Sequence, residues 1–179
     1  MADPEAIVQS ARQLQLEIDK IGMGKSPHAE IQILKQDDFI VLYDLLIKSS
    51  ELINSTRKLF LDGHYARAVE EAYKCINNTV KDKSQLALDG QDLMNQVFSE
   101  KNPVIKLNQL KTVSHKDEQR GYMFIFGGCM TGIRNPRAHE HKKTDTPESA
   151  LEMLVWANHL MSLVEKAKRK KKSKKMPKT

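Results

Sequence analysis

The segment best equipped for chemistry is GIRNPRAHEH, residues 132–141, in which four residues separate Arg134 from His139. An imidazole can accept and donate a proton near neutral pH. A guanidinium carries a permanent charge and fixed donors that match phosphate oxygens. The two groups therefore suit cleavage of RNA by its own 2′-hydroxyl, with His139 transferring protons and Arg134 stabilising charge on the phosphorane. The spacing by itself is a weak pattern, because a surface Arg and a capping His also produce it.

The local sequence predicts a helix junction inside this segment. Pro136 cannot continue a preceding helix, and it disfavours the α conformation at Asn135. Asn135 is then expected to be the N-cap, and Pro136 the first residue, of a new helical turn. Arg134 would end one helix, and His139 would lie in the first turn of the next. The free backbone N–H groups between them would offer a place for a phosphate.

Neighbouring polar residues are secondary candidates for the same site. Asn135 is predicted to cap the turn and to share in catalysis, whereas Arg137, His141 and Lys142 are candidates for substrate binding. The competing interpretation of Arg137 is an exposed side chain paired with Glu140. The two histidines of the segment superficially resemble a metal site, but they have no third ligand nearby. We therefore predict neither a metal nor a cofactor.

Apolar residues recur at helical spacing along the chain, and no segment shows the alternation of a strand. Residues 101–114 are expected to form an extended loop. Thr146 is the expected N-cap of the last helix, with Pro147 at its first position. The predicted helices cover residues 7–21, about 37–61, 65–83, 91–98, 116–133 and 147–165. This pattern indicates an all-α bundle of about four core helices.

The predicted elements divide the chain into four parts. They are an N-terminal amphipathic helix or arm, a linker, the helical domain and a disordered basic tail, covering residues 1–24, 25–36, 37–165 and 166–179. The N-terminal helix has two interpretations. It is expected either to pack on its own domain or to serve as a dimerising or partner-binding arm.

Charge is unevenly distributed along the 179-residue chain, whose formal net charge is +6. Nine of the 29 Lys and Arg residues lie between Lys166 and Thr179, where there is no Asp or Glu, so the rest of the chain carries 20 basic against 23 acidic residues. A block of like charge is self-repelling. The tail is expected to hold RNA or DNA electrostatically, to keep the protein soluble, or to dock on an acidic partner.

The location of the protein is inferred from three features. The N-terminal sequence does not contain a basic stretch followed by an apolar block, which is the pattern of a secretory signal. No uncharged run is long enough to span a bilayer. Cys75 and Cys129 lie inside helical patterns and are expected to be reduced. We therefore predict a cytoplasmic protein without membrane attachment.

Three segments of the sequence resemble the Ymh family of the HEPN superfamily. They are DGHYARAVEEAYKCINN (62–78), DGQDLMNQVFS (89–99) and DEQRGYMFIFGGCMTGIRNPRAH (117–139). The resemblance implies a four- to five-helix bundle that forms a homodimer and brings two Arg–His motifs into one cleft. It also implies a metal-independent endoribonuclease that leaves a 2′,3′-cyclic phosphate and a 5′-hydroxyl. Arg134 and Asn135 match the start of the motif, and His139 matches its end.

The same resemblance suggests a biological setting and an alternative. Many members act as toxins or effectors in abortive-infection and other antiviral systems, which implies an inhibitory or activating partner protein. Some members are not ribonucleases, so the alternative is a non-catalytic module that binds a nucleotide, a nucleic acid or a partner protein. Gly127, Gly128 and Gly132 destabilise the helix before the motif. They indicate close approach of another helix, either within one subunit or across a dimer axis.

Overall fold

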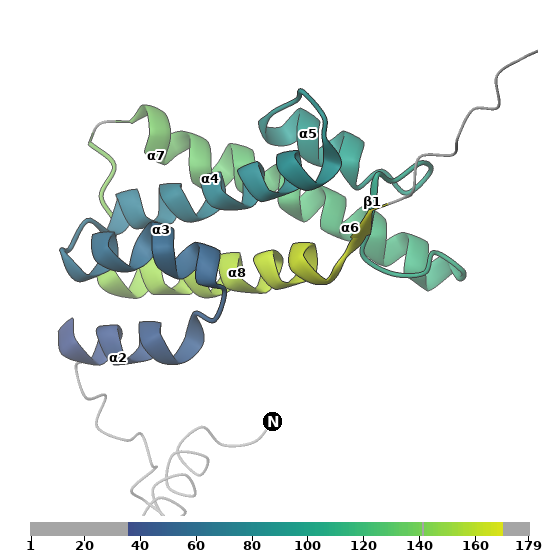
Figure 1. Cartoon of the computed structure of the whole chain (residues 1–179). Coiled ribbons are helices and arrows are strands. Elements are labelled where there is room, and N and C mark those ends of the chain that lie inside the picture. The colour runs from purple at the N-terminus through teal and green to yellow at the C-terminus, as the bar shows by residue number, and fades with distance from the viewer. Residues whose placement is uncertain (1–35, 141, 170–179) are drawn as a thin grey trace, which may run out of the picture. The chain divides into compact units, whose positions relative to one another are not determined.

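The computed structural model describes residues 36–140 and 142–169 of the chain. The predicted N-terminal helix, the linker up to residue 35 and the tail from residue 170 lie outside this part. The described residues belong to one compact unit. Its elements are α2 (Gln36–Leu46), α3 (Ser50–Leu61), α4 (Tyr65–Ser84), α5 (Gly90–Val97), β1 (Ile105–Lys106), α6 (Val113–Cys129), η1 (Met130–Arg134), α7 (Asn135–His139), α8 (Pro147–Lys166) and β2 (Lys168–Arg169) (Figure 1). The predicted all-α class is confirmed.

The helix α4 is the centre of the bundle, because it contacts α3, α5, η1, α7 and α8. Its predicted limits, residues 65–83, differ from the observed ones by one residue. The hydroxyl of Tyr73 donates a hydrogen bond to the carbonyl of Met153 at 3.0 Å, which ties α4 to α8. The apolar side chains that α4 buries recur at three- and four-residue steps, as predicted: Ala68, Val69, Ala72, Tyr73, Ile76 and Val80.

The single helix predicted for residues 37–61 is wrong, since the chain breaks into α2 and α3 at residues 47–49. Ser49 has an extended backbone, with φ −68° and ψ 122°. The backbone N–H groups of Lys48 and Ser49 donate to Oδ1 of Asn158 on α8, at 2.8 and 3.0 Å. The hydroxyl of Ser49 donates to Glu165 at 2.7 Å. The break is therefore stabilised by partners that lie far away in the sequence.

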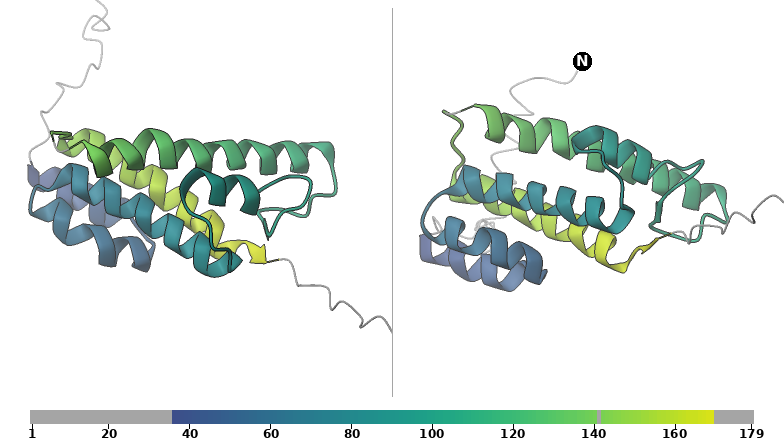
Figure 2. Two further views of the ribbon diagram at one scale, coloured as in Figure 1. Left: turned by 90° about the horizontal axis from the view of Figure 1, so that it is seen from above. Right: turned by 45° about the horizontal axis from the view of Figure 1, so that its top comes forward.

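The predicted helix junction at Pro136 is also wrong. The α6 helix passes through the π-helical turn η1 into α7, and Arg134 (φ −67°, ψ −53°) and Asn135 (φ −61°, ψ −43°) both keep helical backbone angles. The N–H of Asn135 donates to the carbonyl of Met130, five residues back, which is the π-helical pattern. This wider turn accommodates Pro136, whose ring clashes with the carbonyl four residues earlier in a regular α-helix. Figure 2 shows α6, η1 and α7 as one long helical run.

The last helix begins as predicted, because Thr146 accepts a hydrogen bond from the N–H of Ser149 at 3.3 Å and Pro147 is the first helical residue. The helix continues to Lys166, and β2 then pairs antiparallel with β1. The sequence predicts a disordered tail from residue 166 onward, but residues 166–169 form part of the folded unit. The rest of that tail lies outside the described residues.

The two cysteines lie within helices, where Cys75 is half-buried and Cys129 is buried. Cys75 and Cys129 are free thiols, as expected. Burial raises the pKa of both thiols above the usual value. No helix in residues 36–140 and 142–169 combines the length and the apolar character needed to cross a bilayer.

Candidate functional site

The motif residues share one unbroken helical run instead of two helices. Because the N–H of Asn135 is bonded within this run, the free helix N-terminus expected to bind phosphate does not form there. Asn135 is half-buried, and it is not an N-cap. The side chains of Arg134 and His139, rather than backbone N–H groups, are therefore the elements of the predicted site that remain.

Arg134 extends from the end of η1 toward the start of α5. Its Nη2 lies 3.6 Å from Oδ2 of Asp89, and its side chain is 21% exposed. Gly90 has a positive φ of +57°, and a Cβ at this position would lie 3.8 Å from Nη1 of Arg134. The guanidinium is thus held against the beginning of α5, while part of the side chain stays accessible to solvent.

Asp89 is fastened in turn by Asn77, a residue of α4 that is 2% exposed. The Nδ2 of Asn77 donates to Oδ1 of Asp89, and its Oδ1 accepts a bond from the N–H of Gly90 at 2.9 Å. Burial works to raise the pKa of Asp89, but the hydrogen bond from Asn77 and the charge of Arg134 outweigh it, so this pKa lies below the usual value. The result is a fixed carboxylate beside the motif arginine.

Sequence reasoning missed both Asn77 and Asp89. The available signal was the position of Asn77, next to Ile76 and four residues after Tyr73 on the apolar face of α4. A buried amide must find hydrogen-bond partners, so its presence on such a face indicates a structured polar contact. The identity of the partner depends on how the loop after α4 folds back.

His139 is the last residue of α7, and its side chain is exposed. Its imidazole has no hydrogen bond or ion pair with another residue in the described part of the chain. A helix advances about 1.5 Å and turns about 100° per residue, so His139 lies about 7.5 Å along the axis and about 140° around it from Arg134. The structure therefore places the two residues at the same end of the helical run but does not bring their side chains into contact.

Arg137 lies in a buried ion pair rather than on an open surface. Its Nε and Nη2 donate to the two carboxylate oxygens of Asp145 at 2.6 and 2.7 Å, and the two side chains are 6% and 5% exposed. Its Nη1 donates to the carbonyl of Ile133 at 2.9 Å. The interpretation of Arg137 as an exposed side chain paired with Glu140 is therefore wrong. The geometry favours a structural role, fastening the loop after α7, over the predicted role in substrate binding.

Two other predicted substrate-binding residues follow the motif. Lys142 is exposed in the loop between α7 and α8. His141 lies outside the described residues. Within residues 36–140 and 142–169, no three His, Cys, Asp or Glu side chains gather closely enough to hold a metal ion. Of these two positions, Lys142 supplies an accessible cation near the motif.

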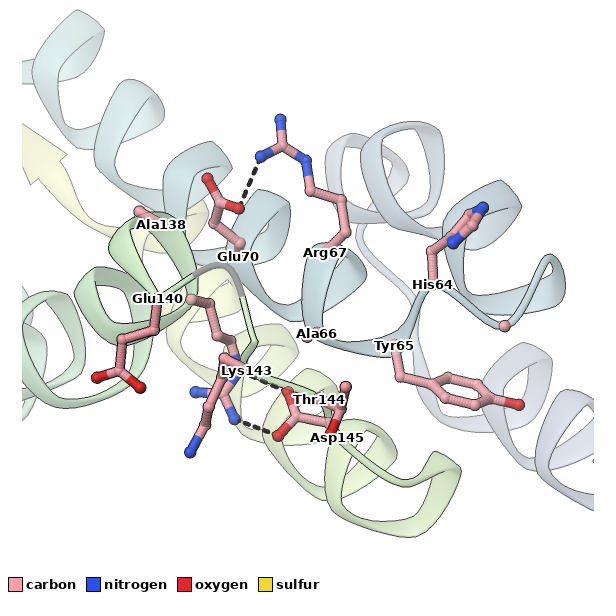
Figure 3. Close-up of a pocket in the computed structure, with 12 residues that line it drawn as sticks. His64, Tyr65, Ala66, Arg67, Glu70, Ala138, Glu140, Lys143, Thr144 and Asp145 are labelled. Atoms are coloured by element: carbon pink, nitrogen blue, oxygen red, sulfur yellow. Dashed lines mark hydrogen bonds and ion pairs between the residues drawn. The ribbon is translucent and has the colours of Figure 1, made fainter.

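A pocket of about 570 Å³ lies beside the motif, between the start of α4 and the loop after α7 (Figure 3). Glu140 and Lys143 contribute to its wall from the motif side. On the opposite wall, Arg67 donates to the carboxylate of Glu70 at 2.7 Å, so these two charges compensate each other. His139 does not line the pocket. The pocket therefore flanks the motif without including the candidate imidazole.

The glycines before the motif have different surroundings. A Cβ on Gly127 would lie 3.2 Å from Oδ1 of Asn95, so α5 accounts for this glycine within the protomer. A Cβ on Gly128 or Gly132 would meet nothing within 4 Å. Phe124 lies on the same side of the helical run, one turn before Gly128, and is 63% exposed. We call this surface, formed by Phe124, Gly128 and Gly132, the open helix face.

Comparison with known protein families identifies a relationship for most of the chain. The model of a protein family described as "Protein of unknown function (Hypoth_ymh)" matches residues 49–164. This range contains Asn77, Asp89 and the whole segment from Arg134 to His139. No curated protein and no solved structure matches the chain.

Proposed function

We propose, from the premise that this chain belongs to the Hypoth_ymh family, that it is a metal-independent endoribonuclease of the HEPN type. The observation that carries the proposal is the pair of groups at the end of the α6–α7 helical run. The guanidinium of Arg134 is oriented by a fixed carboxylate, and the imidazole of His139 is exposed and has no competing partner among the described residues. These are a phosphate-binding cation and a proton-transfer group at the same end of one helical run.

The proposed reaction is a transesterification within RNA. His139 removes the proton of a 2′-hydroxyl, and this oxygen forms a bond to the adjacent phosphorus. The bond from phosphorus to the 5′-oxygen breaks, and that oxygen takes up a proton from an imidazolium. The products are a 2′,3′-cyclic phosphate and a 5′-hydroxyl, so neither water nor a redox partner is consumed. Arg134 donates to the oxygens that gain negative charge, and Asn135 helps to position the phosphate.

A second copy of the chain completes the proposed site. Because Arg134 and His139 leave the helix in directions about 140° apart, one protomer does not direct both groups at a single point. The open helix face continues through Asn135 to His139 at three- and four-residue steps. Its missing side chains at Gly128 and Gly132 allow close approach of another helix. A homodimer through this face would bring two copies of the motif to one cleft.

The test is cleavage of total RNA by the purified full chain at low salt in the presence of EDTA. His139→Ala is expected to abolish cleavage and Arg134→Ala to slow it strongly, whereas His64→Ala, which changes another exposed histidine, is expected to leave it unchanged. Full cleavage by the His139→Ala variant would remove the mechanism. RNA binding by the wild type without cleavage would favour the alternative, a non-catalytic binding module.

A role in antiviral defence, in the cytoplasm and under the control of a partner protein, is part of the same proposal. It predicts that expression of the wild-type chain without its partner slows growth of the host cell. The Arg134→Ala variant is expected to be harmless at the same expression level. Equal toxicity of the wild type and the variant would show that growth inhibition does not depend on Arg134.

A further inference from the structure

The two short strands create a second surface, at the end of the folded unit opposite to α7 (Figure 1). Lys106 of β1 pairs with Lys168 of β2, and Ile105 pairs with Arg169. The beginning of the basic tail is thereby fixed to the loop between α5 and α6. The run of like charge at the end of the sequence therefore starts from a defined position on the domain.

Both strands are anchored to the bundle by buried or partly buried polar groups. The side chain of Gln119, fully buried in α6, donates to the carbonyls of Phe98 and Ile105 at 3.1 and 3.0 Å and accepts from the N–H of Leu107 at 3.0 Å. On the other side, the ammonium of Lys83 donates to the carbonyls of Val164 and Glu165 at the end of α8, the latter at 3.1 Å. These contacts hold the backbone on both sides of the strand pair in place.

A pocket of about 520 Å³ opens between these anchored segments. Its lining contains no Asp or Glu, and four of its side chains are lysines: Lys106, Lys111, Lys166 and Lys168. None of the four forms an ion pair with a residue in the described part of the chain. Asn108, which also lines the pocket, donates a hydrogen bond to Glu118 at 2.7 Å. We call these four residues the lysine pocket.

We propose that the lysine pocket binds the phosphate backbone of a nucleic-acid strand and holds RNA on the enzyme away from the motif. Four uncompensated ammonium groups around one hollow favour a polyanion, and Lys side chains bind phosphate as point charges without reading sequence. Phosphate binding follows from the pocket alone. The identity of the strand as RNA rests on the proposed function.

The position of the pocket sets a length requirement. Residues 113–139 form one helical run, which spans about 40 Å at about 1.5 Å per residue. A stacked strand advances about 3.4 Å per nucleotide, so roughly 12 nucleotides bridge the distance from the lysine pocket to His139. Longer strands can contact both surfaces, whereas shorter ones reach only one of them.

The first experiment measures binding of a fluorescein-labelled RNA of roughly 24 nucleotides, about twice that bridging length, by fluorescence anisotropy. All proteins are full chains carrying His139→Ala, so that the probe stays intact. The six lysines beyond residue 169 are also replaced by Gln, which removes their contribution. In this background the lysine-pocket variant carries Lys106→Gln, Lys111→Gln, Lys166→Gln and Lys168→Gln. The matched control carries the same change at Lys48, Lys58, Lys74 and Lys101.

The lysine-pocket variant is expected to bind at least tenfold more weakly than the control at low salt. Each phosphate contact to a single strand contributes about 0.7 to the slope of log K against log salt, so the slope should fall by about 3 when four contacts are lost. Circular dichroism should show the same helix content in both variants. Equal affinity and equal slope for the pocket variant and the control would overturn the proposal.

The second experiment separates this inference from the ribonuclease proposal. With His139 and the tail restored, the lysine-pocket variant is expected to cleave a substrate of roughly 24 nucleotides with a raised KM and an unchanged kcat, and to cleave one of roughly 6 nucleotides like the wild type. A lowered kcat with both substrates would overturn the docking role. If no protein cleaves RNA, the ribonuclease proposal fails, while the difference in binding between pocket variant and control still tests the pocket.

Discussion

The guanidinium of Arg134 lies 3.6 Å from the carboxylate of Asp89, which is itself held by the buried side chain of Asn77. These contacts connect the centre of α4 to the end of η1. The motif arginine is therefore oriented from the core of the bundle rather than by its own helix. A change at Asp89 should disturb Arg134 without touching the substrate.

Replacement of Asp89 by Asn is the direct test of this orientation. The substitution keeps the size of the side chain but removes the charge that faces Arg134. We expect kcat for RNA cleavage to fall about tenfold with little change in KM, since misplacement of a catalytic group costs rate rather than binding. In the Arg134→Ala background the same substitution should cause no further loss. Equal losses in both backgrounds would mean that the two residues act independently.

The lowered pKa of Asp89 predicts a pH dependence of stability. Because the folded state binds this proton more weakly than the unfolded state, protonation favours unfolding. The stabilisation is present above the ordinary pKa of 3.8 and is lost as the pH falls through the lower folded-state value. Urea unfolding should show a constant difference between the wild type and Asp89→Asn from neutral pH down to about pH 5, and a shrinking one below. A difference that does not change with pH would contradict this assignment.

The buried ion pair of Arg137 and Asp145 predicts a loss of stability rather than of substrate affinity. Removing one partner leaves an uncompensated buried charge, which costs about 3–5 kcal/mol of unfolding free energy. Arg137→Ala is therefore expected to unfold at a much lower urea concentration than the wild type. The matched control is Arg57→Ala, which breaks the exposed pair with Asp44, worth about 0–1 kcal/mol. Equal effects of the two substitutions would show that burial does not govern this pair.

The parts of the fold that the sequence predicts correctly are those set by local patterns. The apolar face of α4 and the Thr146–Pro147 start of α8 follow from side-chain spacing and capping alone. The break at Ser49 does not, because its backbone N–H bonds to Asn158, 109 residues away. The partner of Arg137 was also missed, since Glu140 is nearer in sequence but Asp145 is brought back by the loop after α7.

Sequence patterns propose candidate residues for the site but do not predict its backbone geometry. The rule that Pro ends a helix places a junction at Asn135, whereas the π-turn lets the helix continue past Pro136. Such a turn has no reliable sequence signature. The role of Asp89 was unpredictable for a different reason. It depends on the buried position of Asn77 and on the fold of the loop after α4.

The open helix face predicts that a larger side chain at Gly128 blocks self-association. In the protomer a Cβ at this position meets nothing within 4 Å, so Gly128→Leu should fold normally and gain helix propensity of roughly 1 kcal/mol. Sedimentation velocity is expected to show a dimer for the wild type and a monomer for this variant, with loss of RNA cleavage. Gly127→Ala is the control, because that position faces α5. A dimeric Gly128→Leu variant would exclude this face as the contact.

The buried side chain of Gln119 predicts that the lysine pocket and the bundle are coupled. Gln119→Leu removes one acceptor and two donated bonds, so the carbonyls of Phe98 and Ile105 and the N–H of Leu107 lose their partner. The expected cost is on the order of 3 kcal/mol of unfolding free energy, because buried polar groups would be left unsatisfied. Hydrogen exchange should also become faster in residues 98–107, while α4 keeps its protection. If exchange in this segment stayed unchanged, Gln119 would not be what holds β1 against the bundle.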